Sequence, residues 1–558
     1  MKPLANIAPI GHPHEPPWGP PNILHENSAD LENTRDDTPP FDLLITDGFV
    51  IDGTGRPGRV TDIGIREGRI LALGELKGRS ARERIEAKGL VVAPGFIDIH
   101  AHADVSLLLD PTDEPRLRQG VTTVVFSNCG LGFAPASEMS LALLKRAYAG
   151  VFGSWEAPRP WRSVREYLEL FVGRTTVNIA YLVPHAAVRA LVLGLERRAA
   201  TEREIAEMAD LVRQAMAEGA FGLSTGLAYA PMAFATREEL RALLRAVGEW
   251  GGFFAIHLRD YFDGLDDALT EALTLADETG VPVQISHLQT AGRGNWGKAE
   301  ALLEQLHRAR ERGVDVTFDS YPYTAGSTFL HALLPEWAQA GDAEQILTRL
   351  HDPLIRRRII TELNLAPRDW ASVTVSGLTT RRNAFALGRS LAEIARARGI
   401  SVGEAIVQLL REEELQVSII SHHGYEPDVC RILRDPFHMI GSDGIQTGQR
   451  PHPRLYGAFA RFLGHYVRER GLLPLEEAVR KITALPAARL RLRDRGTVEV
   501  GKMADLVLFD PQAIGDRADY AHPRRFARGI EYVLIRGHVV KDRSGLTGAR
   551  PGLVLHPG

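Results

Sequence analysis

Six side chains of types that bind metal ions follow apolar segments of this chain. Imidazole and thiolate are preferred ligands of zinc, and a carboxylate can complete or bridge such a site. Bound Zn²⁺ lowers the pKa of its water from roughly 16 to about 7, and it also polarises a substrate carbonyl. These residue types therefore indicate hydrolysis by metal-activated water. The six residues are His100, His102, Cys129, His257, His287 and Asp443.

Two of these histidines are spaced to share one ion. His100 and His102 close the apolar stretch VVAPGFIDIHAHAD, and residues two apart in a strand point to the same side. Asp443 is the one carboxylate of the set, and in GSDG it stands between small residues that leave room for water and substrate. We expect it to be the general acid/base that takes the water proton and returns it to the leaving nitrogen. The alternative role is a purely ligating carboxylate.

The elements that must position these residues are strands followed by helices. Residues 201–219, for example, begin with Thr201, carry Glu204 three residues later and stop at Gly219, a pattern typical of a capped helix. Eight such units predict an α/β protein with a closed (β/α)₈ TIM barrel, whose chemistry lies at the C-terminal mouth. Each metal-binding candidate stands at the end of a predicted strand. The eight predicted strands cover residues 91–102, 121–130, 177–185, 220–227, 253–259, 282–288, 314–322 and 437–444.

Other segments predict the parts outside the barrel. Short strand patterns near both chain ends predict a small β-sandwich domain built from 41–92 plus 490–545, with the barrel over 93–489. A mostly helical insertion of about 331–435 separates the seventh and eighth strands, and we expect it to act as a lid. Residues 1–40 are Pro-rich and polar, which predicts a flexible N-terminal extension.

Composition narrows the function class. The 558 residues are 44% hydrophobic and 24% charged, as in an ordinary globular protein. A net charge of −4 gives no support for nucleic acid or a membrane surface as partner, and no apolar run reaches the ~20 residues of a membrane span. Two cysteines favour a cytoplasmic location. A small-molecule substrate is expected, and the oligomeric state stays open.

Other histidines have plainer interpretations. His185 ends the third predicted strand, and a lone histidine there is more often a hydrogen-bonded core residue than a ligand. His422 and His423, in ISHHGY, stand outside the eight strand ends and are expected in a loop.

The order of the motifs resembles the amidohydrolase superfamily and, within it, the N-acyl-D-amino-acid deacylase (D-aminoacylase) family. The similarity spans about residues 41–545 and rests on PGFIDIHAHAD, SNCG, GLSTGLAYAP, QISHLQTAGRGNWGKA, DSYPYTAGST, IGSDG and RPHPRLYGAFARFLGHYVRE. It implies zinc-dependent hydrolysis of the amide bond of N-acyl-D-amino acids, giving a carboxylate and a free D-amino acid. One alternative is a cyclic-amide hydrolase of the hydantoinase or dihydroorotase type. Many of these enzymes use a carboxylated Lys as metal bridge, whereas the D-aminoacylase family has a Cys at the second strand, which here is Cys129. Another is a non-catalytic scaffold, which the intact ligand set opposes.

The resemblance also implies roles for single residues. Cys129, His257 and His287 would form the tight zinc site, and His100, His102 and Asp443 a second, weaker or vacant one, so that one or two Zn²⁺ are expected. Asp443 would be the catalytic acid/base.

Substrate contacts are implied as well, at Tyr321, Ser327 and Arg454. A guanidinium fork such as that of Arg454 suits an α-carboxylate, and the Tyr321 hydroxyl would donate to the carbonyl oxygen. Gln289 stands where the family often has Lys, and a neutral amide cannot replace that charge. Tyr261 also departs from the smaller or polar residue that is common at its position. Both differences concern the preferred amino acid more than the hydrolytic chemistry.

Overall fold

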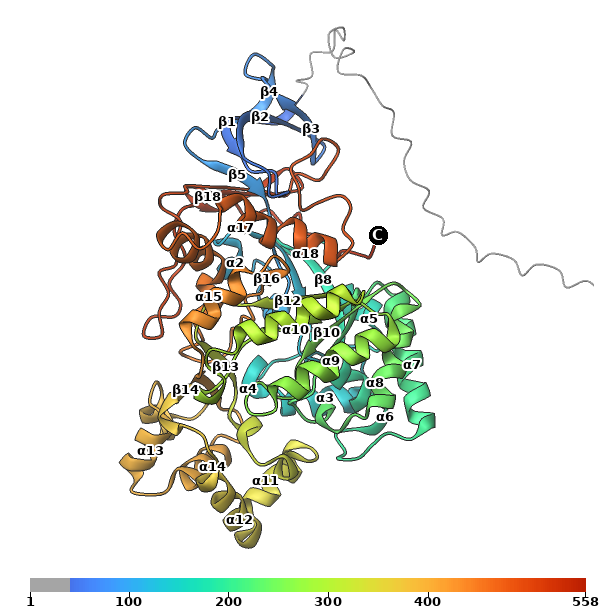
Figure 1. Ribbon diagram of the computed structural model, residues 1–558, viewed down its shortest axis with the longest axis vertical. Coiled ribbons are helices and arrows are strands. Elements are labelled where there is room, and N and C mark those ends of the chain that lie inside the picture. The colour runs from blue at the N-terminus through green and yellow to red at the C-terminus, as the bar shows by residue number, and fades with distance from the viewer. Residues whose placement is uncertain (1–40) are drawn as a thin grey trace, which may run out of the picture.

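An eight-stranded parallel barrel forms the centre of the protein. The computed structural model describes residues 41–558, so the predicted extension of residues 1–40 lies outside the described residues (Figure 1). The strand order is β16-β12-β11-β10-β9-β8-β7-β6, and one parallel bridge between Ala101 and Gly444 links the two end strands. The nearly closed barrel confirms all eight predicted strands. They are β6 (Phe96–Asp98), β7 (Val121–Phe126), β8 (Asn178–Pro184), β9 (Gly222–Gly226), β10 (Phe253–His257), β11 (Val283–Ile285), β12 (Val316–Ser320) and β16 (His438–Ile440).

Amphipathic helices cover the outside of the barrel. The α7 helix begins where its sequence predicts, because Thr201 and Glu204 form a reciprocal capping box. Its buried residues Met208, Val212 and Met216 recur every fourth position and so face the barrel. The main outer helices are α6 (His185–Leu193), α7 (Glu202–Ala217), α8 (Arg237–Gly248), α9 (Leu265–Thr279), α10 (Ala299–Glu311), α15 (Glu426–Arg434), α16 (Arg454–Arg461), α17 (Leu475–Ile482) and α18 (Ala484–Arg489).

Shorter helices fill the segments around β6, β7 and β8. They are α1 (Ser106–Leu109), α2 (Glu114–Leu117), α3 (Glu138–Ala147), α4 (Ala149–Phe152) and α5 (Val164–Leu168). Within residues 41–558, none of the helices combines the length and the apolarity that crossing a bilayer demands.

The insertion between β12 and β16 has a core of its own, with Leu330, Ile359, Leu391 and Leu410 buried in one cluster. Its helices are α11 (Ala343–His351), α12 (Pro353–Leu365), α13 (Leu391–Arg398) and α14 (Val402–Glu412), as the predicted helical insertion requires. It also contains an antiparallel sheet in the order β13-β15-β14, which the sequence did not reveal. Its strands are β13 (Ala325–Phe329), β14 (Val373–Gly377) and β15 (Ser418–His422). The prediction that His422 lies in a loop is therefore wrong, since this residue ends β15.

Strands from both chain ends pair in one nine-stranded sheet at the end of the molecule opposite the insertion (Figure 1). The central strand β5 runs parallel to β1 and antiparallel to β17, so that Val92 lies opposite Leu508. This sheet confirms the small β unit formed from both ends; the boundaries 41–92, 490–545 and 93–489 stay predictions. Its strands are β1 (Phe41–Val50), β2 (Arg59–Arg66), β3 (Arg69–Gly74), β4 (Ala81–Glu86), β5 (Val91–Pro94), β17 (Leu506–Phe509), β18 (Ile530–Ile535), β19 (His538–Asp542) and β20 (Gly545–Leu546).

Candidate metal centre and active site

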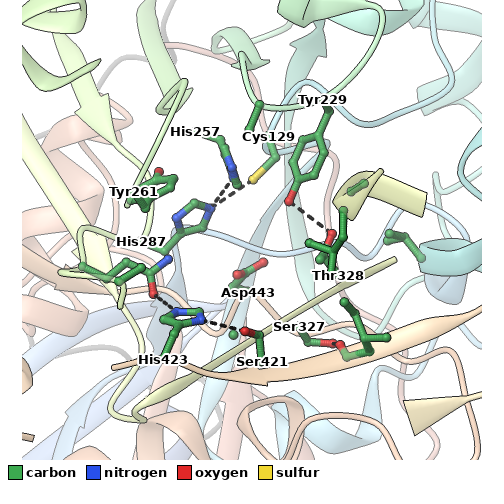
Figure 2. Close-up of a pocket in the computed structure, with 18 of the residues that line it drawn as sticks. Cys129, Tyr229, His257, Tyr261, His287, Ser327, Thr328, Ser421, His423 and Asp443 are labelled. Carbon is green, nitrogen blue, oxygen red and sulfur yellow. Dashed lines mark hydrogen bonds between the residues drawn. The ribbon is translucent and has the colours of Figure 1, made fainter. Parts of the chain in front are cut away.

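The barrel brings all six predicted metal ligands together at its C-terminal mouth. His100 and His102 both follow β6, and each of the other four follows or ends a strand of its own. All six side chains are buried. Figure 2 shows Cys129, His257 and His287 pointing toward one another, with Asp443 beside them. Cys129, His287 and Asp443 have φ values of 55°, 33° and 46°. A non-glycine residue in this left-handed region is strained, and such residues cluster at functional sites.

One group of donors consists of Cys129, His257 and His287. The Sγ of Cys129 lies 3.4 Å from Nε2 of His287, and Nδ1 of His257 lies 2.9 Å from the same nitrogen. The three donor atoms all fall within 4.8 Å of one another. Ligands at 2.0–2.3 Å from a tetrahedral zinc ion are about 3–4 Å apart, so the group fits such an ion.

A second group contains His100, His102 and Asp443. Oδ1 of Asp443 lies 3.1 Å from Nε2 of His102 and 3.6 Å from Nε2 of His100. Nε2 of His100 also lies 3.3 Å from the Cys129 sulfur. Cys129 is therefore shared between the two groups, a position from which a thiolate could contact ions on both sides.

The charge balance of the site fits a divalent cation. Burial disfavours the Cys129 thiolate, but the positive charge of His100 and His287 outweighs burial and holds the pKa of this thiol well below its usual range. Burial opposes protonation of His102 too, yet its hydrogen bonds with Asp443 and Cys129 raise its pKa to about 9. Protonated imidazoles thus balance the buried anions here. A divalent cation that displaced those protons would supply the same positive charge.

Asp319, in β12, contacts two of the predicted ligands from behind. Its Oδ1 lies 3.1 Å from Nδ1 of His100 and accepts the backbone N–H of His287 at 2.8 Å. Its other oxygen accepts from the Gln284 side chain at 2.9 Å. A carboxylate on the far nitrogen of a ligating histidine fixes the ring and its tautomer. Sequence reasoning missed Asp319, although an acidic residue inside the apolar strand VTFDS was the signal available.

A cavity of about 210 Å³ opens beside the predicted metal ligands. Three of the predicted substrate residues, Tyr321, Ser327 and Gln289, line it. Arg454 is fully buried behind them: Nη1 lies 2.9 Å from Oδ2 of Asp443, and the guanidinium carbon stands 4.4 Å from the centre of the Tyr321 ring. Apolar lining residues of the cavity include Leu131, Val151, Phe262, Ala332, Leu333, Ile419 and Ile445.

His423 lies in the loop after β15, as expected, but it also lines this cavity. Its Nε2 is hydrogen-bonded to Oε1 of Gln289 at 2.8 Å, and its Nδ1 lies 3.2 Å from the Ser421 hydroxyl (Figure 2). His423 reaches the mouth because it directly follows β15, and the sequence pattern did not predict that this strand lies beside the barrel. His185, by contrast, lies in a separate buried network with Thr225 and Glu239, as expected of a core histidine.

Comparison with known proteins agrees with this architecture and donor set. The sequence pattern of the Amidohydrolase family matches residues 83–541. A D-aminoacylase of Alcaligenes xylosoxydans xylosoxydans is 40% identical over 527 residues, which cover 94% of this chain and 99% of that protein.

Two solved structures are similar over nearly the whole chain. The N-acyl-D-glutamate deacylase of Bordetella bronchiseptica, complexed with zinc and a phosphonate that mimics the tetrahedral intermediate, is 36% identical with a TM-score of 0.79, over 92% of this chain and 99% of that one. A D-aminoacylase whose binuclear centre shows one-metal activation and second-metal attenuation is 38% identical with a TM-score of 0.80, over 93% and 100%. The chain therefore belongs to the amidohydrolase family and, within it, groups with the N-acyl-D-amino-acid deacylases.

Proposed function

We propose that this protein hydrolyses the amide bond of N-acyl-D-amino acids, giving a carboxylate and a free D-amino acid. The observation that carries the proposal is the donor group of Cys129, His257 and His287 beside a cavity at the barrel mouth. Relatives at 36–40% identity support the substrate class, since they include a D-aminoacylase and an N-acyl-D-glutamate deacylase.

Zinc is the proposed cofactor, with Cys129, His257 and His287 as its tight site and His100, His102 and Asp443 as a second position. A zinc ion there would supply a Lewis acid for the substrate carbonyl and a water of lowered pKa. The donor set of thiolate and imidazoles suits zinc better than magnesium or calcium, which prefer oxygen ligands.

Asp443 is proposed to move the proton. Burial opposes its ionisation, but Arg454 and His100 hold the pKa of this carboxyl well below its usual range, so it is a carboxylate at neutral pH. It takes the proton of the attacking water on a carboxylate oxygen and returns it to the amide nitrogen as the bond breaks.

Tyr321 and Ser327 are proposed to position the substrate. Burial raises the pKa of Tyr321, which keeps its proton available for a hydrogen bond to the carbonyl oxygen as negative charge develops. Arg454 is proposed to position two side chains: Asp443, through their ion pair, and Tyr321, through contact with its ring near the substrate carbonyl.

The location is proposed to be cytoplasmic. Both cysteines are free, Cys129 buried and Cys430 half-buried, as is usual in a reducing compartment.

The test is the release of free amine from N-acetyl-D-Leu, -Met, -Phe, -Glu and -Asp, each beside its L form. Turnover of D forms that Cys129→Ala abolishes and Cys430→Ala leaves intact would support the proposal. Activity that survives both Cys129→Ala and complete metal removal would refute the zinc mechanism. Ring opening of hydantoins without turnover of linear substrates would instead favour a cyclic-amide hydrolase.

A further inference from the structure

Two guanidinium groups line the active-site cavity in the described part of the chain, and their surroundings differ. Arg259 donates from Nε and Nη2 to the two oxygens of Glu271, at 2.9 and 2.8 Å, and from Nη1 to the carbonyl of Ala233 at 3.0 Å. Its charge is thus already paired. The Arg368 guanidinium has neither a hydrogen bond nor an ion pair with another side chain among residues 41–558.

Arg368 reaches the cavity from the insertion, in the segment between α12 and the short helix η6 (Trp370–Ser372). Its guanidinium carbon lies 4.8 Å from the centre of the Phe262 ring and 5.8 Å from that of Trp370. Phe262 belongs to the loop after β10, so this contact joins the insertion to the barrel mouth. Stacking against aromatic rings holds a guanidinium plane while leaving its N–H groups free to donate.

Neighbouring groups of the cavity compensate the charge of Arg368 only in part. Asp260 interacts with it electrostatically, but Oδ1 of Asp260 accepts the N–H of Phe262 at 2.8 Å and Oδ2 accepts that of Gly264 at 2.9 Å. His423 adds no second cation, because burial and the charge of Arg368 lower its pKa to about 3. Burial lowers the pKa of Arg368, and its interaction with Asp260, which forms no ion pair with it among residues 41–558, does not offset this.

We propose that Arg368 binds a carboxylate of the substrate and is a specificity-determining residue of the reaction. The inference rests on the proposed function. Five donors in a planar fork match a carboxylate in two parallel hydrogen bonds, and the amide of Gln289 faces the same cavity without a charge of its own. The anion-binding charge of this cavity thus comes from the insertion, so a bound substrate would link the insertion to the barrel.

Three substrates test the inference through release of acetate: N-acetyl-D-leucinamide, N-acetyl-D-Leu and N-acetyl-D-Glu carry none, one and two carboxylates. With Arg368→Gln we expect kcat/KM to fall about 10-fold to 100-fold for a carboxylate substrate, mainly through KM, and to change little for the amide. A loss for both acids assigns the α-carboxylate to Arg368, and a loss confined to N-acetyl-D-Glu assigns the side-chain carboxylate.

Two further variants control the measurement. Arg357→Gln removes an equal charge from an exposed position on α12, outside the cavity, and should leave all three rates unchanged. Arg368→Lys keeps the charge without the fork, so its kcat/KM for the acids should fall less than that of Arg368→Gln. It also tests the inference if Arg368→Gln is unstable. The inference is overturned if the wild-type enzyme is active and both Arg368 variants keep its preference for the acids over the amide. A wild-type enzyme that releases acetate from none of the substrates refutes the proposed function instead.

Discussion

Nη1 of Arg454 lies 2.9 Å from Oδ2 of Asp443, and both side chains are buried. A buried carboxylate would ordinarily hold its proton, because burial disfavours the charged form. The neighbouring guanidinium reverses this preference, and the pKa of Asp443 falls well below its usual range. The proposed acid/base of the site therefore depends on a residue that does not itself line the cavity.

Replacing Arg454 should move the acid limb of the pH–rate profile. Arg454→Met removes the largest interaction that lowers the pKa of Asp443, so this pKa rises and the active carboxylate is lost at a higher pH than in the wild type. A shift of about 1 to 3 pH units is expected from losing one adjacent opposite charge. Arg461→Met, on the same helix α16 but paired with Asp516, should leave the limb in place. An unshifted limb in Arg454→Met would show that the ion pair does not set this pKa.

Single-ligand variants should separate the two proposed metal positions. His257→Asn removes a donor of the tight group, so we expect the purified protein to contain almost no zinc. His102→Asn removes a donor of the second group only, and about one equivalent should remain. Elemental analysis of both variants after dialysis decides the matter, and a His102 variant devoid of zinc would contradict this assignment.

Asp319 should tune metal affinity without touching the metal. Asp319→Asn keeps the shape of the side chain but weakens its hold on His100 and on the backbone of His287. Loss of such a partner typically lowers metal affinity by roughly 10-fold to 100-fold. Competition with a zinc chelator measures the change, with Asp277→Asn on the exposed face of α9 as control. Equal zinc affinity in the two variants would show that Asp319 does not support metal binding.

His423 should affect substrate binding more than chemistry. His423→Ala deletes the hydrogen bond to Gln289 and widens the cavity, so we expect KM to rise about 3-fold to 10-fold with zinc content unchanged. The neighbouring His422 packs against Tyr520 and is exposed at the end of β15, so His422→Ala is a matched control. Steady-state kinetics on N-acetyl-D-Leu test this, and identical KM values in the two variants would argue against the role.

The sequence predicted those features that depend on local pattern. Each barrel strand is a short apolar run followed by a helix, and residues at strand ends must meet at the mouth, which placed His257 beside His287 without further information. The features that it did not predict depend on pairing over long distances. β13 carries mostly small and polar residues in AGSTF, and only its partner β15, nearly a hundred residues away, makes it a strand. The position of His423 follows from that pairing, and the burial of Arg454 from the packing of α16.

The nine-stranded sheet has a consequence for how the chain is made. β5 is complete when residue 94 has been synthesised, but its antiparallel partner β17 begins at residue 506. The whole barrel and the insertion must leave the ribosome before Val92 gains its neighbour Leu508, so one edge of β5 waits unpaired for over four hundred residues. Folding of this unit is therefore a late event that closes the chain on itself, in contrast to domains that fold in order from the N-terminus during translation.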